Sequence, residues 1–352
     1  MSYQHLPGSQ MTLYAELLDQ SIQTAASEAV AGALSGSFTS KEIKGRTYWY
    51  LQRSHGEKKH QTYLGPESPS LVRWIDQTKG KTAGIETDRK NLVRISRMLV
   101  SGGATAEPAF VLKALRLLSD SRVFQLGGVL IGTLAFRAYA NLLGVRFSRS
   151  TLQTQDLDIA QDPSIGVALA RETSAVNLEN FIEASGLDLH PVPPLDRKRP
   201  STSFKVRGRD LRIDFLTPMK GKETQQPVFL PAFKLSAQPL RHLGYLLEPV
   251  AQAVILGSDP VLVNLPDPAR FALHKMWTSS RRLPAFQTKA KKDILQAELL
   301  IEALLDERPD DLRSAWKSLP DARARTLVSA AGSKLDPELQ ERFNSLTITK
   351  AL

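Results

Sequence analysis

The chain has 352 residues, of which 42% are apolar and 23% charged, and it contains no cysteine. This composition is typical of a soluble protein with two or three domains, and it excludes disulfides, thiolate zinc sites and a cysteine nucleophile. No run of about 20 uninterrupted apolar residues and no basic-then-apolar leader is visible, so we expect a cytoplasmic protein without a membrane partner. The net charge of +10 favours an anionic partner, nucleic acid first and a triphosphate second; the alternative is a protein that is merely basic.

The first elements expected are a helix over residues 13–34, ended at Gly36, and a small antiparallel sheet over residues 37–66. Gly45, a turn at residues 54–57 and Gly65-Pro66 divide that sheet into two or three strands. Such a sheet buries little by itself, so it is expected to lean on the preceding helix or on residues 71–75.

Basic and aromatic residues alternate through this sheet, which allows two interpretations. The strands could grip a nucleic-acid backbone and stack on bases. Alternatively, Trp49 and Leu51 face a core while lysines keep the sheet edge soluble. The candidate nucleic-acid contacts are Lys44, Arg46, Tyr48, Tyr50, Arg53, Lys58 and Lys59.

A joint is expected at residues 80–84, where glycines recur, so a first domain is predicted over residues 1–84. Helical patterns follow at residues 87–100 and 106–118, the second with Thr105 as N-cap. A catalytic core is predicted over residues 85–220, and a mainly helical domain over residues 221–352 that completes the nucleotide site.

Within the core, the sequence predicts a strand at 123–126, a turn at Gly127-Gly128 and a helix over 129–143. Further strands are expected at 145–147 and 157–160, a helix at 177–184, and a hairpin of 204–206 with 211–216 turned by Gly208. The C-terminal part is expected to hold strands at 253–256 and 261–263, a helix over 270–279 and another from about Ile294.

Paired carboxylates carry the chemistry. In a strand, alternate side chains share a face, so Asp156 and Asp158 point to one side while Leu157 and Ile159 point to the other. Two such carboxylates repel each other unless a cation lies between them, and hard ions such as Mg²⁺ or Mn²⁺ prefer carboxylate and phosphate oxygens. Asp214, flanked by apolar neighbours in its own strand, converges on them if the two strands are adjacent.

Gly127-Gly128, predicted between a strand and a helix, would let backbone amides approach a phosphate closely. Each motif is weak alone, since most Asp-x-Asp pairs are solvated strand or turn residues. The order glycine turn, Asp-x-Asp and a further aspartate on a strand favours a metal site.

This order resembles the nucleotidyltransferase superfamily related to DNA polymerase beta, and more closely the bacterial predicted nucleotidyltransferases and AbiEii-type toxins. The closer resemblance covers most of the chain, through residues 36–38, 48–51 and 63–66, the strand motif at 153–158, and residues 268–275 with 292–293. It implies an α+β fold, with a polymerase beta-like mixed sheet, an N-terminal helix and small antiparallel sheet, and a helical C-terminal domain.

The resemblance also assigns residues. It implies that Asp156, Asp158 and Asp214 bind metal, with Asp214 as third ligand or as base toward the attacking hydroxyl. It implies nucleotide contacts from Gly127, Gly128, Lys275, Lys292 and Asp293. From the residues alone, Lys275 could instead be a solvated helix residue and Asp293 a helix cap. His274 is expected to pack against its helix rather than to act in catalysis. The family usually places its Asp-x-Asp about ten residues beyond the glycine pair and a serine after the first glycine. Here Asp156 lies 28 positions after Gly128, and that serine is absent.

The expected activity is a metal-dependent transfer of an NMP from an NTP, such as ATP, to RNA, with tRNA as the first candidate and a toxin role with a cognate antitoxin. The alternatives are transfer to a protein or a small molecule, or an inactive transferase fold that binds nucleic acid.

Overall fold

A computed structural model describes residues 2–32, 37–55, 58–148, 156–164, 176–194, 196, 198–282 and 286–347. The predicted helix stop at Gly36, residues 56–57 of the predicted turn and residues 153–155 of the strand motif lie outside this part of the chain.

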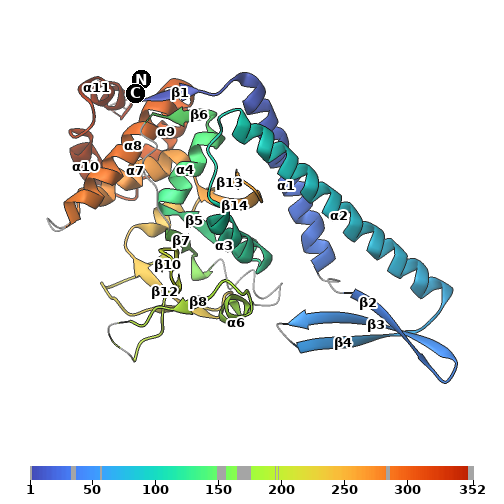
Figure 1. Ribbon diagram of the computed structural model, residues 1–352. Coiled ribbons are helices and arrows are strands. Elements are labelled where there is room, and N and C mark those ends of the chain that lie inside the picture. The colour runs from blue at the N-terminus through green and yellow to red at the C-terminus, as the bar shows by residue number, and fades with distance from the viewer. Residues whose placement is uncertain are drawn as a thin grey trace.

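Two long helices run side by side, and a small sheet joins their far ends and runs back toward the rest of the molecule (Figure 1). They are α1 (Gly8–Gly32) and α2 (Pro69–Ser101), and the sheet consists of β2 (Ser37–Ile43), β3 (Arg46–His55) and β4 (Lys58–Pro66). Helix α2 continues through residues 80–84, so the joint predicted there is wrong. A helical glycine costs about 1 kcal/mol relative to alanine, which the packing of a 33-residue helix outweighs. The proposed domain boundary at residue 84 falls inside this helix.

The small sheet is antiparallel in the order β2-β3-β4, as the sequence predicts. Lys44 and Gly45 both have positive φ, 53° and 73°, the backbone that a two-residue hairpin turn between β2 and β3 requires. Leu51 of the sheet and Ile75 of α2 are buried. The Trp49 indole donates a hydrogen bond to Glu67, just before α2. The sheet therefore leans on the start of α2, one of the two supports expected for it.

The core is a mixed sheet with the order β11-β12-β10-β7-β5. Strand β7 is parallel to β10, β10 is parallel to β12, and β5 is antiparallel to β7. Strands β8 and β9 extend the sheet beside the first half of β10. The bounds are β5 (Val129–Ile131), β7 (Asp156–Ala160), β8 (Leu189–Pro191), β9 (Ser203–Val206), β10 (Arg212–Pro218), β11 (Val228–Leu230) and β12 (Leu235–Leu240).

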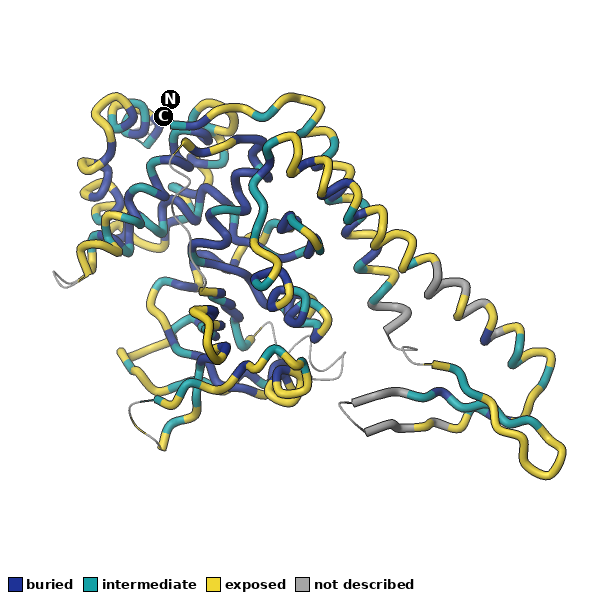
Figure 2. Tube along the Cα trace, viewed as in Figure 1, coloured by how far each residue is buried: buried dark blue, intermediate teal, exposed yellow. Residues whose placement is uncertain are grey.

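Helices and two smaller strand pairs surround this sheet, and the buried residues concentrate here rather than in the small sheet (Figure 2). The strand pairs are β1 (Tyr3–His5) with β6 (Val145–Phe147), and β13 (Val250–Ile255) with β14 (Val261–Pro266). The helices are α3 (Ala109–Asp120), α4 (Gly132–Leu142), α6 (Leu178–Glu183), the 3-10 helix η1 (Leu243–Leu246), α7 (Pro268–Ser279), α8 (Gln287–Glu307), α9 (Pro309–Lys317), α10 (Ala322–Gly332) and α11 (Pro337–Thr347). The predicted mixed α+β class and helical C-terminal region are confirmed.

Two predicted elements before the carboxylate strand are wrong. Residues 123–126 form turns, and residues 129–143 divide into the strand β5 and the helix α4. A short apolar run fits a strand as well as a helix, and pairing with β7 decides for the strand here. Gly132, with φ of +72°, then redirects the chain into the helix.

The predicted N-cap at Thr105 is also wrong. The next helix, α3, begins at Ala109 after Pro108, which occupies the N-cap position without a side-chain hydrogen bond. The Thr105 amide instead donates to the Asn141 side chain at 2.8 Å, tying this segment to α4.

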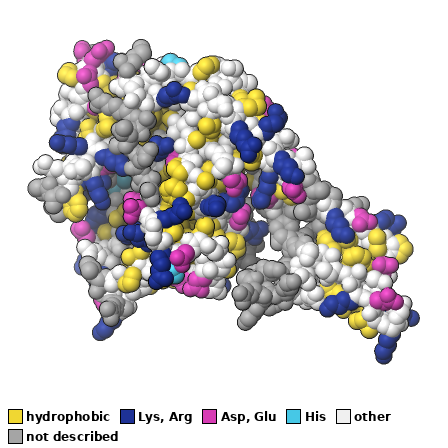
Figure 3. Space-filling model, in the orientation of Figure 1, with side chains coloured by type: hydrophobic (Ala, Val, Ile, Leu, Met, Phe, Trp, Pro, Cys, Tyr) yellow, Lys and Arg dark blue, Asp and Glu magenta, His cyan; other side chains and the backbone are white. Residues whose placement is uncertain are grey.

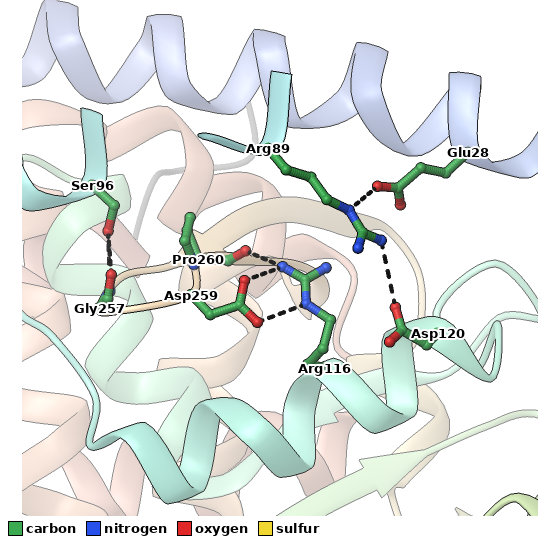
Figure 4. A network of polar contacts seen from close by, with 8 residues as sticks. All are labelled: Glu28, Arg89, Ser96, Arg116, Asp120, Gly257, Asp259 and Pro260. Atoms are coloured by element: carbon green, nitrogen blue, oxygen red, sulfur yellow. Dashed lines mark hydrogen bonds and ion pairs between the residues drawn. The ribbon is translucent and has the colours of Figure 1, made fainter. Parts of the chain in front are cut away.

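Polar contacts fix the α1–α2 pair to the core, and we call this cluster the helix-pair anchor (Figure 4). Arg116 of α3 binds Asp259 through two nitrogens, at 2.7 and 2.9 Å, and also donates to the Pro260 carbonyl. Arg89 of α2 pairs with Glu28 of α1 at 2.6 Å and reaches Asp120 of α3 at 3.8 Å. The Ser96 hydroxyl donates to the Gly257 carbonyl. The anchor joins both long helices to α3 and to the β13–β14 turn.

A search of the described helices finds none that combines the length and the apolarity needed to cross a bilayer.

Candidate active site

Three aspartates lie on adjacent parallel strands, as the sequence predicts. In the register of β7 and β10, Asp158 stands opposite Asp214, and Asp156 stands opposite Arg212. The intervening Leu157 and its neighbours on β10 are fully buried on the other face of the sheet. The carboxylates therefore share the face that is not occupied by the core.

These aspartates line a cavity of about 500 Å³ between the sheet and the start of α8. The other polar side chains that line it come from α4, the β9–β10 hairpin, β12, and the helices α7 and α8 with the segment between them. They are Thr133, Thr202, Ser203, Arg212, Gln238, Lys275, Arg282, Lys289, Lys292 and Asp293. The cavity thus brings together Asp156, Asp158, Asp214, Lys275, Lys292 and Asp293 of the sequence-predicted site.

The glycine next to the carboxylates is Gly132, not the predicted pair. Gly132 directly follows β5 and opens α4, and a Cβ at this position would overlap the Asp158 carboxylate. Gly127 and Gly128 lie at the opposite end of β5; Gly127 borders a different cavity, and the Gly128 carbonyl accepts a hydrogen bond from Asn264. The structure therefore does not bring Gly127 and Gly128 to the cavity of the aspartates, because the strand and the helix expected on either side of them are placed differently.

With Gly132 as the reference, Asp156 lies 24 positions further on, and Thr133 supplies a hydroxyl directly after the glycine. The sequence signal for this turn was the apolar triplet 129–131 followed by Gly-Thr. The more conspicuous Gly127-Gly128 obscured it.

Asp158 is electrostatically strained. Burial and the neighbouring Asp214 raise its pKa from 3.8 to about 6, and Asp156 adds to the effect while Lys275 opposes it. A carboxylate in this condition gains from a nearby cation, which would remove the repulsion between the acidic side chains.

Asp214 is already engaged on the side away from Asp158. Its carboxylate accepts hydrogen bonds from Arg212 Nε at 2.7 Å and from the Ser203 hydroxyl. Among the described residues, no group of three or more His, Cys, Asp or Glu side chains is gathered closely enough to hold a metal ion. The three carboxylates share one cavity, but the predicted convergence on a single point is not realised.

Three cationic side chains, Lys275, Arg282 and Lys292, border the cavity across from the aspartates, and we call them the basic wall. Lys275 Nζ lies 2.8 Å from Asp293, and Arg282 lies 2.6 Å from the other oxygen of the same carboxylate. The Asp293 side chain is only 4% exposed and lies inside α8, so neither a solvated Lys275 nor a capping Asp293 is correct. Asp293 orients two cations toward the cavity rather than facing it as an isolated acid.

The pKa values of Lys292 and His274 are lowered in this region. Burial, together with the charge of Lys275, lowers the pKa of Lys292. Burial lowers the pKa of His274 to about 3, again helped by Lys275, so this histidine is neutral near pH 7. His274 is thus a packed side chain, as expected.

Sequence reasoning missed several members of the cavity: Gly132, Thr133, Ser203, Arg212, Arg282 and Lys289. Apart from the Gly132-Thr133 turn, their spacing in the sequence carries no signature, because different elements bring them together. As a whole the cavity joins an acidic face of the sheet to a wall of cations, an arrangement that suits a divalent ion and a chain of phosphates.

Comparison with known proteins agrees with this chemistry. A family model described as nucleotidyltransferase matches residues 109–321, more than half of the chain, including all three aspartates and the basic wall. The chain belongs to this nucleotidyltransferase family. No curated protein and no solved structure gives a significant match. The matched segment begins at α3, so the small sheet and the whole α1–α2 pair lie outside it.

Proposed function

We propose that this nucleotidyltransferase moves an NMP from an NTP to a hydroxyl of an RNA acceptor in a reaction that depends on Mg²⁺ or Mn²⁺. The observation that carries the proposal is the cavity itself, in which Asp156, Asp158 and Asp214 face the cations held by Asp293. In the reaction, the acceptor oxygen bonds to the α-phosphorus while the bond from that phosphorus to the bridging oxygen breaks. Pyrophosphate leaves, and a carboxylate accepts the hydroxyl proton.

The donor set fits a hard divalent ion, since three carboxylates and the Thr133 hydroxyl border one cavity. Asp156 and Asp158 would hold the ion, and Asp214 would join them by exchanging its contact with Arg212. When bound, the ion polarises the phosphoryl oxygens and neutralises developing charge. The raised pKa of Asp158 supports this assignment, because an ion there offsets the repulsion from Asp214.

The basic wall is the proposed seat of the NTP phosphates. Lys275, Lys292 and Arg282 border the cavity opposite the aspartates. Asp293 positions Lys275 and Arg282, and it does not itself contact the phosphates. Gly132, at the N-terminus of α4, takes the phosphate-approaching role first assigned to Gly127 and Gly128.

The acceptor assignment rests on the basic composition and on the resemblance to the AbiEii-type toxins, which also suggests a toxin role with an antitoxin partner. It is tested by incubating the protein with labelled NTPs, Mg²⁺ and total RNA or protein. Label on RNA that is removed by nuclease but not by protease is the expected result. Protease-sensitive label would move the acceptor to protein. Absence of transfer in every combination, with Asp156→Ala indistinguishable from the wild type, would leave only a binding function.

Gly132→Ala is expected to lower the transfer rate on the order of 100-fold, because the new Cβ displaces the Asp158 carboxylate and enters the path of the phosphates. The measurement is the rate of label transfer at saturating NTP. Gly208→Ala is the matched control, since Gly208 also has φ of +72° but open space around its Cα. Both variants share a backbone cost of about 1–2 kcal/mol, and only Gly132→Ala should lose activity. Equal loss in both would assign the effect to backbone strain.

A further inference from the structure

One face of the small sheet gathers three tyrosines, of which Tyr63 is exposed and Tyr48 and Tyr50 are half-buried. Tyr63 is 54% exposed, and its ring lies 5.5 Å from that of Tyr50 and 6.2 Å from that of Tyr48. Lys41 Nζ lies 5.0 Å from the centre of the Tyr50 ring and donates to Gln61. We call this surface, formed by Lys41, Arg46, Tyr48, Tyr50 and Tyr63, the tyrosine face.

The acidic residues that the structure describes in this region, Glu42 and Glu67, lie on the opposite side. Glu42 pairs with Thr47 and alternates with Lys41, so it points away from the tyrosines. Glu67 accepts the Trp49 indole hydrogen bond on the side that packs against α2. Arg46 alternates with Tyr48 and shares its face. The tyrosine face therefore carries aromatic and cationic groups, with the exposed Ile43 at its turn end, and no described carboxylate.

This separation of acidic side chains from aromatic and cationic ones is a feature of the small sheet. On the side of the molecule shown in Figure 3, basic side chains are spread widely with acidic ones between them, so net charge alone selects no surface. Three solvent-accessible rings beside two cations are the arrangement that stacks on unpaired bases and contacts their phosphates. A protein partner would more often meet a face with apolar side chains at its centre, whereas these rings carry hydroxyls and adjoin a glutamine pair, Gln52 and Gln61.

The position of the tyrosine face also favours a polymeric ligand over a small molecule. It lies at the far end of α2, a helix of 33 residues and thus about 50 Å in length, whose other end is held by the helix-pair anchor (Figures 1 and 4). The small sheet is separate from the core sheet, and none of its residues lines the cavity of the aspartates. An acceptor bound at both places would therefore bridge two parts of the chain, which suits an extended strand.

We propose that the tyrosine face binds single-stranded RNA by stacking bases on Tyr48, Tyr50 and Tyr63, and that this holds an acceptor strand outside the family-matched segment. The binding itself stands alone, and its use in holding an acceptor rests on the proposed function. Of the contacts expected from sequence, Arg46, Tyr48 and Tyr50 lie on this face and Lys44 in the adjoining turn, while the side chains of Arg53, Lys58 and Lys59 lie outside the described residues.

The test is fluorescence anisotropy of a labelled single-stranded RNA of mixed sequence and about 12 nucleotides, titrated with the full chain. Tyr63→Ala should weaken binding about tenfold, whereas Tyr63→Phe, which keeps the ring, should bind like the wild type. Phe229→Ala is the matched control, because Phe229 is a similarly exposed ring (58%) on β11 of the core. Lys41→Gln should reduce the slope of log affinity against log salt by about 0.7.

Wild-type affinity in Tyr63→Ala, or wild-type binding of duplex RNA as tight as that of the single strand, would overturn the proposal. So would an absence of RNA binding combined with a self-association that Tyr63→Ala abolishes, which would assign the face to a protein contact. Asp158→Asn separates the two ideas, since it should bind this RNA normally. Tyrosine-dependent binding without any transfer by the wild type would overturn the proposed function alone. Transfer that Tyr63→Ala leaves unchanged at limiting RNA would instead remove the face from acceptor binding.

Discussion

Asp158→Asn is expected to lower nucleotidyl transfer on the order of 10²–10³-fold while raising the stability of the fold. The loss of activity follows from removing the central carboxylate of the cavity. The gain in stability follows from the raised pKa of Asp158, about 6, which burial and the adjacent Asp214 produce. Asparagine keeps the shape and removes the charge. At pH 7 the expected gain is about 1–3 kcal/mol, measured by urea unfolding without divalent ions.

The pH dependence of this gain has a definite sign. An acid whose pKa is raised by folding destabilises the native state where it is ionised and has no effect where both states are protonated. The advantage of Asp158→Asn should therefore be absent below about pH 4, grow between pH 4 and pH 6, and be complete above pH 6. Mg²⁺ should stabilise the wild type more than the variant.

Asp162→Asn is the matched control at the end of the same strand. Burial raises the pKa of Asp162, but hydrogen bonds from Ser164 and Lys220 outweigh it and lower the pKa overall. This variant should lose stability rather than gain it and should retain transfer. A destabilised Asp158→Asn protein with normal activity would contradict the account of the cavity.

Asp293→Asn is expected to reduce stability by about 3 kcal/mol and to raise the KM for the NTP. Asp293 is nearly inaccessible and neutralises Lys275 and Arg282 at 2.8 and 2.6 Å, so its loss leaves two cations close together without their counter-charge. Urea unfolding and NTP titration measure the two effects.

The control for this prediction is Asp259→Asn, which breaks another aspartate–arginine pair. Asp259 binds Arg116 with similar geometry, but its side chain is 48% exposed. A solvated pair of this kind contributes about 1 kcal/mol or less. If both variants lost equal stability and kept NTP affinity, Asp293 would have no special part in positioning the basic wall.

The sequence predicted those parts of the site that depend on alternation within a strand. Alternation along the strand places Asp156 and Asp158 on one face and Leu157 on the other. The apolar neighbours of Asp214 indicated the adjacent strand. The small sheet was likewise predicted from its aromatic residues and its turn residues.

The failures arose where tertiary contacts chose between local alternatives. The sequence of residues 129–131 suits a helix, but their pairing with β7 makes them a strand. The glycine at the junction of strand and helix is therefore Gly132 and not Gly128. Arg282 and Ser203 had no sequence signature, because they reach the cavity only through the folding of distant elements. The ion pairs of Asp293 depend on the packing of α7 against α8, which no spacing in the sequence encodes.

The most direct test of the central claim compares NTP labelled at the α-phosphate with NTP labelled at the γ-phosphate, using wild-type and Asp158→Asn protein with Mg²⁺ and RNA. The account predicts that the α-label becomes attached to RNA and the γ-label leaves as pyrophosphate, and that both processes are on the order of 10²–10³-fold slower with Asp158→Asn. Attachment of the γ-label, or equal transfer of the α-label by both proteins, would contradict it.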